Sequence, residues 1–576
     1  MDKKEVAQIL EEIGTLLELH NENPFKVRAY HNASRIIGGL TESLDHLVET
    51  GELRSIKGIG EGLAEKVTEL VKTGHLKYYE DLKKSLPPGL VEMLAIPGLG
   101  PKRIKILYDK LGISTIGELE YACHENRLLD LEGFGLKTQE NILKGIEQVR
   151  RHSEKHLYPA ALEAAERVHG SLAKVKGVIR SSIAGSLRRK KEIIGDIDIL
   201  VSAEPKFVDK IMSSFTSHED VDRIIAKGET KSSVLLKSGI NADLRVISDK
   251  EFPYALHYFT GSKDHNIAMR TLAKKADIKM NEYGLFKGPS EKFIACRDEE
   301  EIFATFGMSY IPPELREDMG EIEAAKAGKL PVLLEESDLR GTFHCHTKYS
   351  DGVNTIEELV KAAKELGWEY LGIADHSKSA AYANGLDEGR VKTQWKEIDQ
   401  LNGKLKGFRI FKGTEADILP DGTLDFSDKI LSGFDYVVVS VHSKFKMTEQ
   451  EMTKRIIKAL KNKYTTMIGH LTGRLLLSRE GYPVDVEAVI NAAADYGKMI
   501  EINAHPLRLD LDWRWCKYAK EKGVLIPINP DAHNAEGLRD TFYGVGVARK
   551  GWLEKKDVVN TYNTSEVEKL FERTRA

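Results

Sequence analysis

The pattern of apolar and polar positions changes along the chain and divides it into regions of different expected architecture. Over the first 150 residues apolar side chains recur at helical spacing, beginning with Val6, Leu10, Ile13 and Leu17, which predicts a helical region. From residue 151 to about 318, helical segments alternate with strand-like ones, which indicates mixed α and β domains. From residue 337 onward, short apolar strands are separated by helical segments, a rhythm typical of a β/α barrel.

The length and these changes of pattern give the expected domain boundaries. A chain of 576 residues is too long for one hydrophobic core and is expected to hold several domains. The predicted divisions are helical domains at 1–80 and 81–150, an α+β domain at 151–250, a small α/β domain at 251–318, a charged and exposed linker at 319–336, and the barrel at 337–576.

Composition narrows the setting of the protein without identifying its function. The net charge is −4, so any affinity for nucleic acid has to come from local patches. The four cysteines form no Cys-x-x-Cys pair, which favours a reducing compartment over a disulfide framework. Neither a signal-peptide core nor an apolar run long enough to span a membrane is seen in the sequence. We therefore expect a cytoplasmic protein without a membrane partner.

Three carboxylates mark the α+β region as a candidate for metal chemistry. Asp196 and Asp198 are two apart in an apolar, strand-like context, so their side chains face the same way. Asp243 lies in a second alternating strand and is expected to join them from a neighbouring position. Carboxylates this close repel each other unless a cation lies between them, and hard oxygen ligands suit Mg²⁺ or Mn²⁺.

A candidate phosphate cradle precedes these acids. Gly185 and Ser186 form a predicted turn, followed by Arg188 and Arg189, and arginine suits phosphate oxygens. Two metal ions beside a phosphate cradle is the arrangement for in-line phosphoryl transfer. A lone pair of acids at a strand end is more often only solvated, so the prediction depends on the whole combination.

The helical region holds three copies of one glycine motif. Each copy reads apolar-x-Gly-apolar-Gly before a predicted helix, and the glycine pairs are Gly58 and Gly60, Gly98 and Gly100, and Gly133 and Gly135. Glycine lets the backbone approach a ligand, and a helix N-terminus offers free N–H groups to phosphate. The motif resembles the helix-hairpin-helix, which grips the DNA backbone without reading sequence. The alternative, glycines used only for packing, would be favoured for a single copy.

Histidines and acids recur at the predicted strand ends of the barrel. The nine candidate ligands are His344, His346, Asp351, His376, Glu415, His442, His470, Asp531 and His533. Imidazole with carboxylate suits Zn²⁺, Mn²⁺ or Fe²⁺, and such a cluster generates a hydroxide nucleophile at neutral pH. One histidine at a strand end is usually a core residue, but nine such residues predict a metal centre.

The carboxylate motif and its surroundings resemble the family X DNA polymerases, the polymerase beta group. The match continues through Tyr258–Ser262 and Asn281–Tyr283. The resemblance implies a nucleotidyltransferase palm whose acids, Asp196, Asp198 and Asp243, bind two Mg²⁺ or Mn²⁺ ions. It also implies a set of residues that contact the incoming nucleotide and the new base pair. These are Gly185, Ser186, Arg189, Gly195, Tyr258, Phe259, Gly261, Asn266 and Arg270.

The chain departs from the polymerase beta pattern at several positions. Ile267 stands where the beta member carries a lysine, and Asn241 stands where it carries an arginine, which bears on nucleotide affinity and fidelity. Lys66 lies where lyase members of the family form a Schiff base with deoxyribose phosphate. Gly62 replaces another lysine of that site. The commoner interpretation of Lys66 is a lysine on a solvated helix face, so lyase activity is only an alternative.

The barrel segment resembles polymerase and histidinol phosphatase (PHP) domains, which are distorted seven-stranded β/α barrels. All nine positions of that family's metal set are filled, which implies a cluster of up to three Zn²⁺, Mn²⁺ or Fe²⁺ ions and an active phosphoesterase.

Together the resemblances imply a bacterial or archaeal type of family X polymerase that works as a monomer. It would fill gaps in DNA during repair, using gapped or primer–template DNA and deoxynucleoside triphosphates. The barrel would act as a 3′–5′ exonuclease, with abasic-site cleavage or 3′-end trimming as further activities. Two alternatives stay open: a PHP domain with only a structural role, and a chain that mainly binds DNA ends with weak template-independent transfer.

Overall fold

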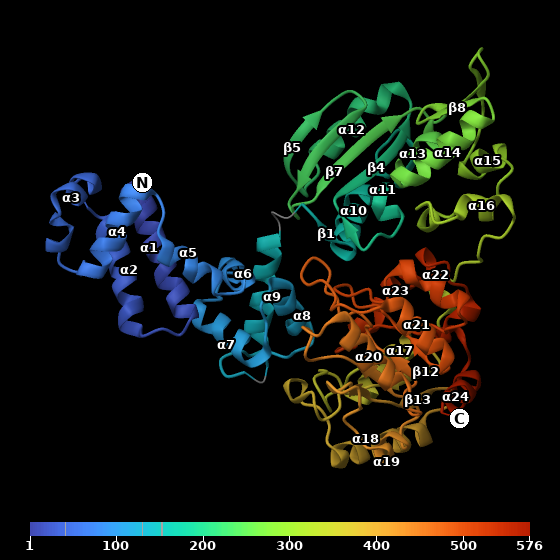
Figure 1. The fold of residues 1–576 in the computed structure, drawn as a ribbon. Coiled ribbons are helices and arrows are strands. Elements are labelled where there is room, and N and C mark those ends of the chain that lie inside the picture. Colours follow the sequence, from blue (N-terminus) through green and yellow to red (C-terminus); the bar gives the residue numbers. More distant parts are fainter. Residues whose placement is uncertain (41, 130, 151–153, 576) are drawn as a thin grey trace. The chain divides into compact units, whose positions relative to one another are not determined.

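The computed structural model describes residues 1–40, 42–129, 131–150 and 154–575. The chain divides into two compact units, Met1–Val149 and Arg150–Ala576, which are coloured along the sequence in Figure 1. Residues 151–153, the predicted start of the palm, lie outside the described residues. Among the described residues, no helix combines the length and the apolar character that a membrane crossing needs.

The first unit is helical, as its apolar spacing predicts. An Asp2–Glu5 capping box starts its first helix by satisfying backbone N–H groups. One hydrophobic cluster extends from Val6 to Ile146, so the two predicted helical domains share a single core. The helices are α1 (Lys3–Leu19), α2 (Pro24–Gly38), α3 (Leu44–Thr50), α4 (Glu61–Thr73), α5 (Lys77–Lys84), α6 (Pro88–Glu92), α7 (Pro101–Leu111), α8 (Ile116–His124) and α9 (Leu136–Arg150), with short 3-10 turns at Glu52–Ser55 and Met93–Ala95.

The second unit begins with a five-stranded sheet of strand order β2-β4-β7-β6-β5. Strands β4 and β7 are parallel, and the other neighbours are antiparallel. Apolar residues of α10 and α12 share a core with alternate residues of the strands. The other face is covered by the following helix at Leu200 and stays open at the start of β4. The elements are α10 (Tyr158–Leu172), β2 (Val178–Ile183), α11 (Gly185–Arg188), β4 (Asp196–Ala203), α12 (Val208–Thr216), β5 (Val221–Lys227), β6 (Lys231–Leu236) and β7 (Asn241–Ile247), with a small ladder of β1 (His156–Leu157) and β3 (Ile193–Ile194).

A small α/β region follows the sheet. Its elements are α13 (Phe252–Thr260), α14 (Lys263–Lys275), β8 (Ile278–Asn281), β9 (Gly284–Lys287), β10 (Lys292–Ile294), α15 (Glu299–Thr305), a 3-10 turn at Pro313–Leu315 and α16 (Glu321–Lys326). The last helix lies within the segment predicted to be an exposed linker. There the structure differs, because Glu321 is fully buried against His265 and Ile322 joins a hydrophobic cluster. The charged sequence of this segment therefore did not reveal the buried hydrogen bond, 2.6 Å long, between His265 Nδ1 and Glu321 Oε1.

The C-terminal region is the predicted β/α barrel (Figure 1). Its parallel strands are β11 (Gly341–Thr342), β12 (Tyr370–Ile373), β13 (Arg409–Lys412) continuing into β14 (Glu415–Asp417), β15 (Val438–Ser440), β16 (Met467–Ile468), β17 (Met499–Ile500) continuing into β18 (Ile502–Asn503), and β19 (Ile528–Asn529). A parallel bridge between Cys345 and Ala532 joins the first strand segment to the last. The strands therefore close into a ring, and Phe343, Tyr436 and Phe571 pack in one of its apolar clusters.

The helices of the barrel follow its strands in chain order. They are α17 (Ile356–Glu365), α18 (Glu388–Lys404), α19 (Asp428–Leu431), α20 (Glu449–Leu460), α21 (Val486–Asp495), α22 (Trp513–Glu521), α23 (Thr541–Lys550) and α24 (Thr564–Arg573). An apolar cluster that extends from Leu334 to Val558 joins several of these helices to the strands. The strand ends are thereby held in fixed positions, and these ends carry the predicted ligands.

Candidate active sites

The three palm carboxylates come together on the sheet. Asp198 and Asp243 are directly paired across the parallel strands β4 and β7, and Asp196 lies two residues before Asp198 on the same face. Burial, with Asp196 and Asp243 as nearby negative charges, raises the pKa of Asp198 to about 6. The charged form of Asp198 is thus disfavoured without a nearby cation, as expected of carboxylates that fit a divalent ion.

A lysine that the sequence did not suggest completes this face. Lys231 begins β6, and its Nζ lies 2.5 Å from Oδ2 of Asp243. Together with Arg245, it opposes the rise in the pKa of Asp198. Asn241, which stands where the beta member has an arginine, is exposed. Lys231 thus supplies a cation from another strand, and only the pairing of β6 with β7 reveals it.

The Gly185–Ser186 turn lies against the carboxylates. Gly185 has a φ of +65°, and a Cβ added there would meet Oδ2 of Asp198 at 2.4 Å. Only glycine therefore lets the turn approach the acid so closely. Ser186 is half-buried, while Gly195 is exposed directly before β4. The predicted phosphate cradle and the predicted metal ligands are neighbours in space.

Two arginines after this turn, Arg188 and Arg189, form hydrogen bonds with Thr260, the last residue of α13. Arg189 is buried; its Nε donates to Glu317 Oε1 at 2.9 Å and its Nη1 to the Thr260 carbonyl at 2.6 Å. Arg188 donates to Glu299 at 2.7 Å and to the hydroxyl of Thr260 at 2.7 Å. Arg189 is thus engaged by protein groups, and its direct contact with phosphate stays a prediction.

The residues predicted to contact the sugar and the base pair lie at the end of α13, directly after it and in α14. Nδ2 of Asn266 donates to the carbonyls of Tyr258, at 2.7 Å, and of Gly261, at 3.2 Å. The rings of Tyr258 and Phe259 meet edge to face at 5.1 Å between centroids. Arg270 is exposed one turn further along α14, and its Nε donates to the Asn266 carbonyl at 3.2 Å. Asn266 thereby fixes the shape of the turn that is expected to face the sugar.

The barrel brings all nine predicted ligands into one buried centre. Glu415 lies at its middle: its carboxylate oxygens are 2.9 Å from His376 Nδ1, 3.2 Å from His442 Nε2 and 3.0 Å from His470 Nε2. Asp531 Oδ1 is 3.2 Å from His346 Nε2 and 3.5 Å from His344 Nε2. The carboxylates are therefore placed between rings that belong to different strands.

Ligand atoms in this centre fall into three overlapping groups, each within 4.8 Å: His346, Asp351, His376 and His533; His344, His346 and Asp531; and His376, Glu415 and His442. The sequence could not divide the ligands among individual ions, and these groups offer a division of eight of the nine; His470 belongs to none of the three. His346 and His376 each belong to two groups. The arrangement suits a cluster of closely spaced ions that share ligands.

The pKa shifts of the rings differ within this centre. Against the effect of burial, nearby carboxylates raise the pKa of His344, His376 and His442, an attraction for positive charge that a bound cation would also meet. Burial, together with the adjacent His533 and His376, lowers the pKa of His346 to about 3, so its ring is neutral, as a ligand must be. The Nδ1 of His346 and the Nδ1 of His470 are buried without a hydrogen-bond partner in the described structure. Buried polar atoms normally have partners, so these nitrogens fit cations.

An outer set of acids, which the sequence analysis did not single out as functional, orients the ligands. Oε2 of Glu501 lies 2.8 Å from His344 Nδ1, and Oδ1 of Asp417 lies 2.5 Å from His442 Nδ1. Asp375 accepts from Thr347 and Gln394, holding the loop before Asp351. Such partners fix the ring orientation of metal-binding histidines. Each lies within or just beyond a strand end, a signal that could have identified it.

The hairpin glycines adopt the conformations that the motif requires. Gly58, Gly98 and Gly133 have φ of +100°, +80° and +84°. Gly60 and Gly100 are the N-caps of α4 and α7, and Gly135 directly precedes α9.

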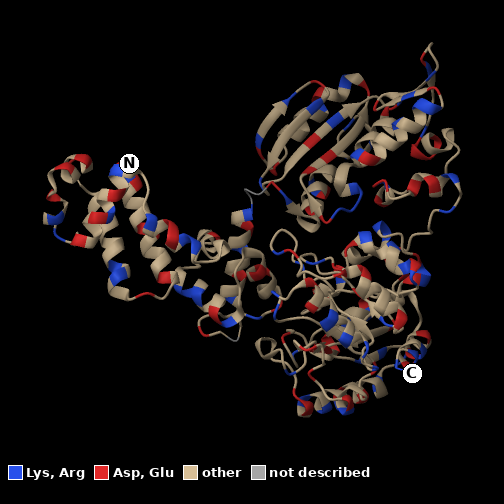
Figure 2. Ribbon diagram, viewed as in Figure 1, with Lys and Arg blue, Asp and Glu red and all other residues tan. Residues whose placement is uncertain are grey.

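The space around these glycines tests the alternative that they serve only for packing. A Cβ added at Gly60, Gly98, Gly100, Gly133 or Gly135 would meet nothing within 4 Å, whereas one at Gly58 would meet Ile36. The positive φ accounts for glycine at Gly98 and Gly133. Neither packing nor a positive φ requires glycine at Gly60, Gly100 and Gly135, which favours an approach to an external ligand there. Basic and acidic residues are interspersed along these helices (Figure 2).

Lys66 lies in an aromatic environment in the first unit. Its Nζ is 5.1 Å from the centroid of Tyr78 and donates to the Gly62 carbonyl at 3.2 Å. Lys26 Nζ is 5.8 Å from the same ring, and Tyr30 stacks on it. Lys26 is paired with a carboxylate, Glu22, at 2.6 Å. The lyase candidate Lys66 thus shares the Tyr78 ring with Lys26, and both lysines have protein partners.

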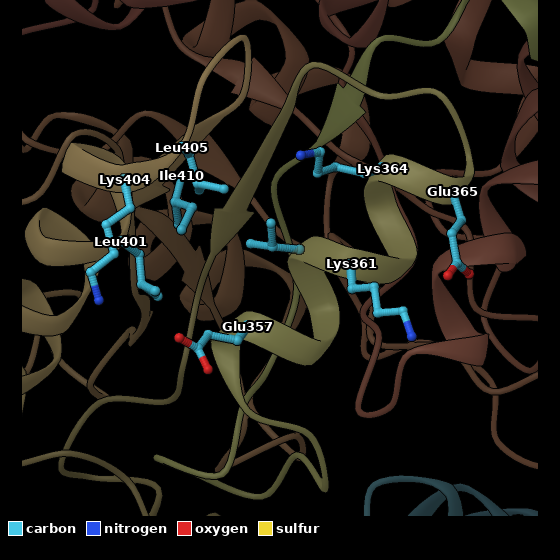
Figure 3. A pocket seen from close by; sticks show the side chains of 9 residues that line it. Glu357, Lys361, Lys364, Glu365, Leu401, Lys404, Leu405 and Ile410 are labelled. Carbon is cyan, nitrogen blue, oxygen red and sulfur yellow. The ribbon is translucent and has the colours of Figure 1, made fainter.

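A separate groove of about 520 Å³ lies between α17 and α18 on the barrel (Figure 3). Val360, Leu401 and Ile410 form its apolar floor, and Lys361, Lys364 and Lys404 lie among the charged residues around it. None of its lining residues is a predicted ligand, so this groove is distinct from the metal centre.

Comparison with known families matches four stretches of the chain. They are a helix-hairpin-helix domain at residues 1–76, a SAM-like helix-hairpin-helix tandem at 90–148, a DNA polymerase beta thumb at 255–317 and a PHP domain at 342–505.

Among curated proteins, the chain is 38% identical over 575 residues to the DNA polymerase/3′-5′ exonuclease PolX of Bacillus subtilis (strain 168), with 100% of both chains covered. It is 31% identical over 230 residues to a probable phosphatase of Thermoanaerobacter sp. (strain X514), covering 38% of this chain and 89% of that protein. A probable phosphatase of Acetivibrio thermocellus is 33% identical over 202 residues, covering 33% of this chain and 78% of that protein.

Proposed function

The chain belongs to the PolX family of DNA polymerase/3′–5′ exonucleases, and we propose how its two acidic centres divide those activities. The protein is a metal-dependent enzyme that fills gaps in DNA with deoxynucleotides and carries a PHP domain with phosphoesterase activity. Its helix-hairpin-helix domains bind DNA. In the proposed division, the palm adds nucleotides and the barrel removes them.

The proposed domains follow the expected boundaries. Residues 1–80 and 81–150 grip the backbone of gapped DNA through the hairpin glycines, and residues 151–250 form the catalytic palm. Residues 251–318 contact the nascent base pair, the segment 319–336 connects the palm and its thumb to the barrel, and residues 337–576 form the phosphoesterase.

In the palm, Asp196, Asp198 and Asp243 hold two Mg²⁺ or Mn²⁺ ions. Such ions neutralise charge on the transferring phosphoryl group and make the primer hydroxyl a better nucleophile. A carboxylate oxygen of Asp243 accepts the proton of that hydroxyl. This role is supported by the in-register pairing of Asp198 with Asp243 on one open face of the sheet.

Residues around the palm acids bind the nucleotide in this proposal. Gly185, Ser186, Arg189 and the Gly195 backbone receive the triphosphate. The turn of Tyr258, Phe259 and Gly261 excludes a ribose 2′-hydroxyl, and Asn266 and Arg270 contact the minor groove. The contacts of Asn266 with the Tyr258 and Gly261 carbonyls support a rigid sugar wall.

In the barrel, the nine ligands hold up to three Zn²⁺, Mn²⁺ or Fe²⁺ ions. Ions in this centre make water a nucleophile at neutral pH and neutralise charge on the phosphodiester. Glu501 and Asp417 orient the ligand rings, and the buried surroundings limit access by bulk water. Cleavage at abasic sites and trimming of blocked 3′ ends would use the same ligands, and we propose that the enzyme acts as a monomer in the cytoplasm.

The observation that carries this proposal is the coexistence of two chemically different centres in one chain. The palm centre consists of carboxylates on an open sheet face, and the barrel centre consists of buried histidines around shared carboxylates. An open acidic face suits ions that arrive with a nucleotide, whereas a buried imidazole cluster suits ions held in advance.

One reaction series tests the proposal. The full-length protein is incubated with a 5′-labelled primer on gapped DNA and Mn²⁺, with and without deoxynucleotides. Shortening without nucleotides and extension with them is the expected result. Extension without shortening would contradict the proposed role of the barrel and favour a structural PHP domain. Blunt DNA serves as the control, because extension there as fast as on gapped DNA would favour the end-binding alternative.

A further inference from the structure

The barrel contacts the loop that carries the predicted triphosphate residues. Helix α23 ends at Lys550, whose Nζ donates to the Arg189 carbonyl at 3.3 Å and to the Glu314 carbonyl at 3.5 Å. Its neighbour Arg549 pairs with the Glu314 carboxylate at 2.8 Å. The phosphoesterase domain therefore reaches both the palm loop and the segment that closes the thumb.

Two buried cations share one carboxylate at this contact. Oε1 of Glu317 accepts from Nε of Arg189 at 2.9 Å and from Nζ of Lys550. Arg189 and Lys550 are 8% and 1% exposed, and the Glu317 side chain is 7% exposed. A single negative charge cannot neutralise two positive ones, and burial strengthens the field of the remainder. Nζ of Lys191 also lies 3.9 Å from Oε2 of Glu317. In the Arg189 cluster, which we define as Arg189, Glu317 and Lys550, positive charges thus outnumber the one carboxylate.

This cluster joins the two turns that frame the predicted nucleotide site. Nη1 of Arg189 holds the Thr260 carbonyl at 2.6 Å, next to Gly261, and its backbone N–H donates to the Gly185 carbonyl at 3.4 Å. Burial lowers the pKa of Lys550 to about 8, against the attraction of Glu317, so the ammonium form still predominates at neutral pH. A positive excess between these turns favours an anionic triphosphate.

We propose that Lys550 is a positioning residue for nucleotide addition, through which the barrel domain sets the affinity of the palm for the incoming triphosphate. It acts by competing with Arg189 for Glu317. Without Lys550, Glu317 would neutralise Arg189 more completely and the site would lose part of its positive excess. This inference rests on the proposed role of Arg189 in triphosphate binding.

The opposite charges in the cluster give a test by rescue. Full-length Lys550→Met, Glu317→Gln and the double variant are compared in filling a one-nucleotide gap. Lys550→Met is expected to raise KM for the nucleotide about fivefold or more, a usual size for coupling between sites, with kcat nearly unchanged. The double variant, in which Arg189 is again an uncompensated cation, is expected to return KM close to the wild-type value.

Controls separate this electrostatic role from packing. Lys458→Met removes an exposed barrel lysine that pairs with Asp421 at 3.3 Å and is expected to leave KM unchanged. Equilibrium binding of the nucleotide to a complex with a dideoxy-terminated primer provides a readout without turnover. Exonuclease rate and melting temperature report whether each variant is folded.

The possible outcomes distinguish failure of this inference from failure of the proposed function. An unchanged KM in Lys550→Met, or a double variant no better than the single one, would overturn the proposal. An unchanged KM in Arg189→Ala would overturn it as well, while leaving the polymerase assignment intact. Loss of extension in the wild-type protein would instead contradict the proposed function itself.

Discussion

The palm and the barrel both gather candidate metal ligands, but these side chains are exposed to solvent to very different degrees. In the palm, Asp196 is exposed and Asp198 and Asp243 are half-buried on an open sheet face. In the barrel, His344 and His346 are fully buried and Glu415 is 1% exposed. In the proposed function, this contrast means that the palm would assemble its ions with each substrate, whereas the barrel would keep its ions between turnovers.

The largest expected effect comes from removing the palm acids. Asp196→Ala with Asp198→Ala should lower primer extension more than about a thousandfold, since the charge that develops in phosphoryl transfer loses its stabilisation. The exonuclease of the same variant should persist. Gel assays of extension and shortening on one labelled primer check both, and loss of both activities would argue against separate centres.

The converse change should be nearly as large. His344→Ala with His346→Ala is expected to reduce shortening of the primer at least about a hundredfold, because ligands are lost from two of the ion groups. Extension should remain near the wild-type rate. If shortening survived in this variant, the barrel would not be its source.

An intermediate effect tests whether the barrel keeps its ions. Glu501→Gln removes the carboxylate beside His344 Nδ1 while preserving side-chain shape, and it should weaken metal affinity about 10- to 100-fold. Metal content after dialysis, measured by elemental analysis, should fall in this variant and stay high in the wild-type protein. Glu449→Gln, at the exposed start of α20, provides a control. Equal metal contents in Glu501→Gln and the wild type would contradict the proposal that Glu501 helps the barrel to retain its ions.

A smaller effect is expected at the palm lysine. Lys231 and a divalent ion compete for the Asp243 carboxylate, so Lys231→Met should lower the half-saturating Mg²⁺ concentration about fivefold, the value of a half-exposed ion pair of ~1 kcal/mol. Its kcat should fall because Asp243 loses the contact that orients it. A Mg²⁺ titration of extension separates these quantities, and a higher Mg²⁺ requirement would contradict the competition.

The smallest effect concerns the DNA that both centres share. Gly100→Ala places a methyl group where the structure has open space, so folding should be preserved while a bound DNA backbone is obstructed. A few-fold loss of affinity for gapped duplex is expected by fluorescence anisotropy, affecting extension and shortening alike. Gly170→Ala, also in open space but within α10, should bind normally. Identical affinities would indicate that this hairpin does not contact DNA.

Local pattern predicted the parts of the molecule that depend on near neighbours in sequence. Alternation around Asp196 and Asp198 placed both acids on one face, and helical spacing placed Asn266 and Arg270 on α14. Strand ends in the barrel identified all nine candidate ligands because that architecture aligns such ends. The repeated glycines were found in the same way.

Contacts between distant segments were beyond such patterns. Lys231 faces Asp243 only because β6 pairs with β7. Glu321 can be buried because its carboxylate lies against the imidazole of His265 on α14. The sharing of Glu317 by Arg189 and Lys550 joins residues from the palm, the thumb and the barrel. The charged sequence around Glu321 predicted an exposed side chain, and this prediction was wrong because a partner distant in the sequence buries it.

Closure of the barrel by the Cys345–Ala532 bridge has a consequence for biosynthesis. Proteins are made from the N-terminus at about 5–20 residues per second, so the ribosome delivers Asp196, Asp198 and Asp243 long before it delivers Asp531 and His533. The nascent chain therefore completes the ligands for nucleotide addition while those for degradation are still unfinished. The barrel can retain its metal only after its last strand emerges, and Lys550 follows later still.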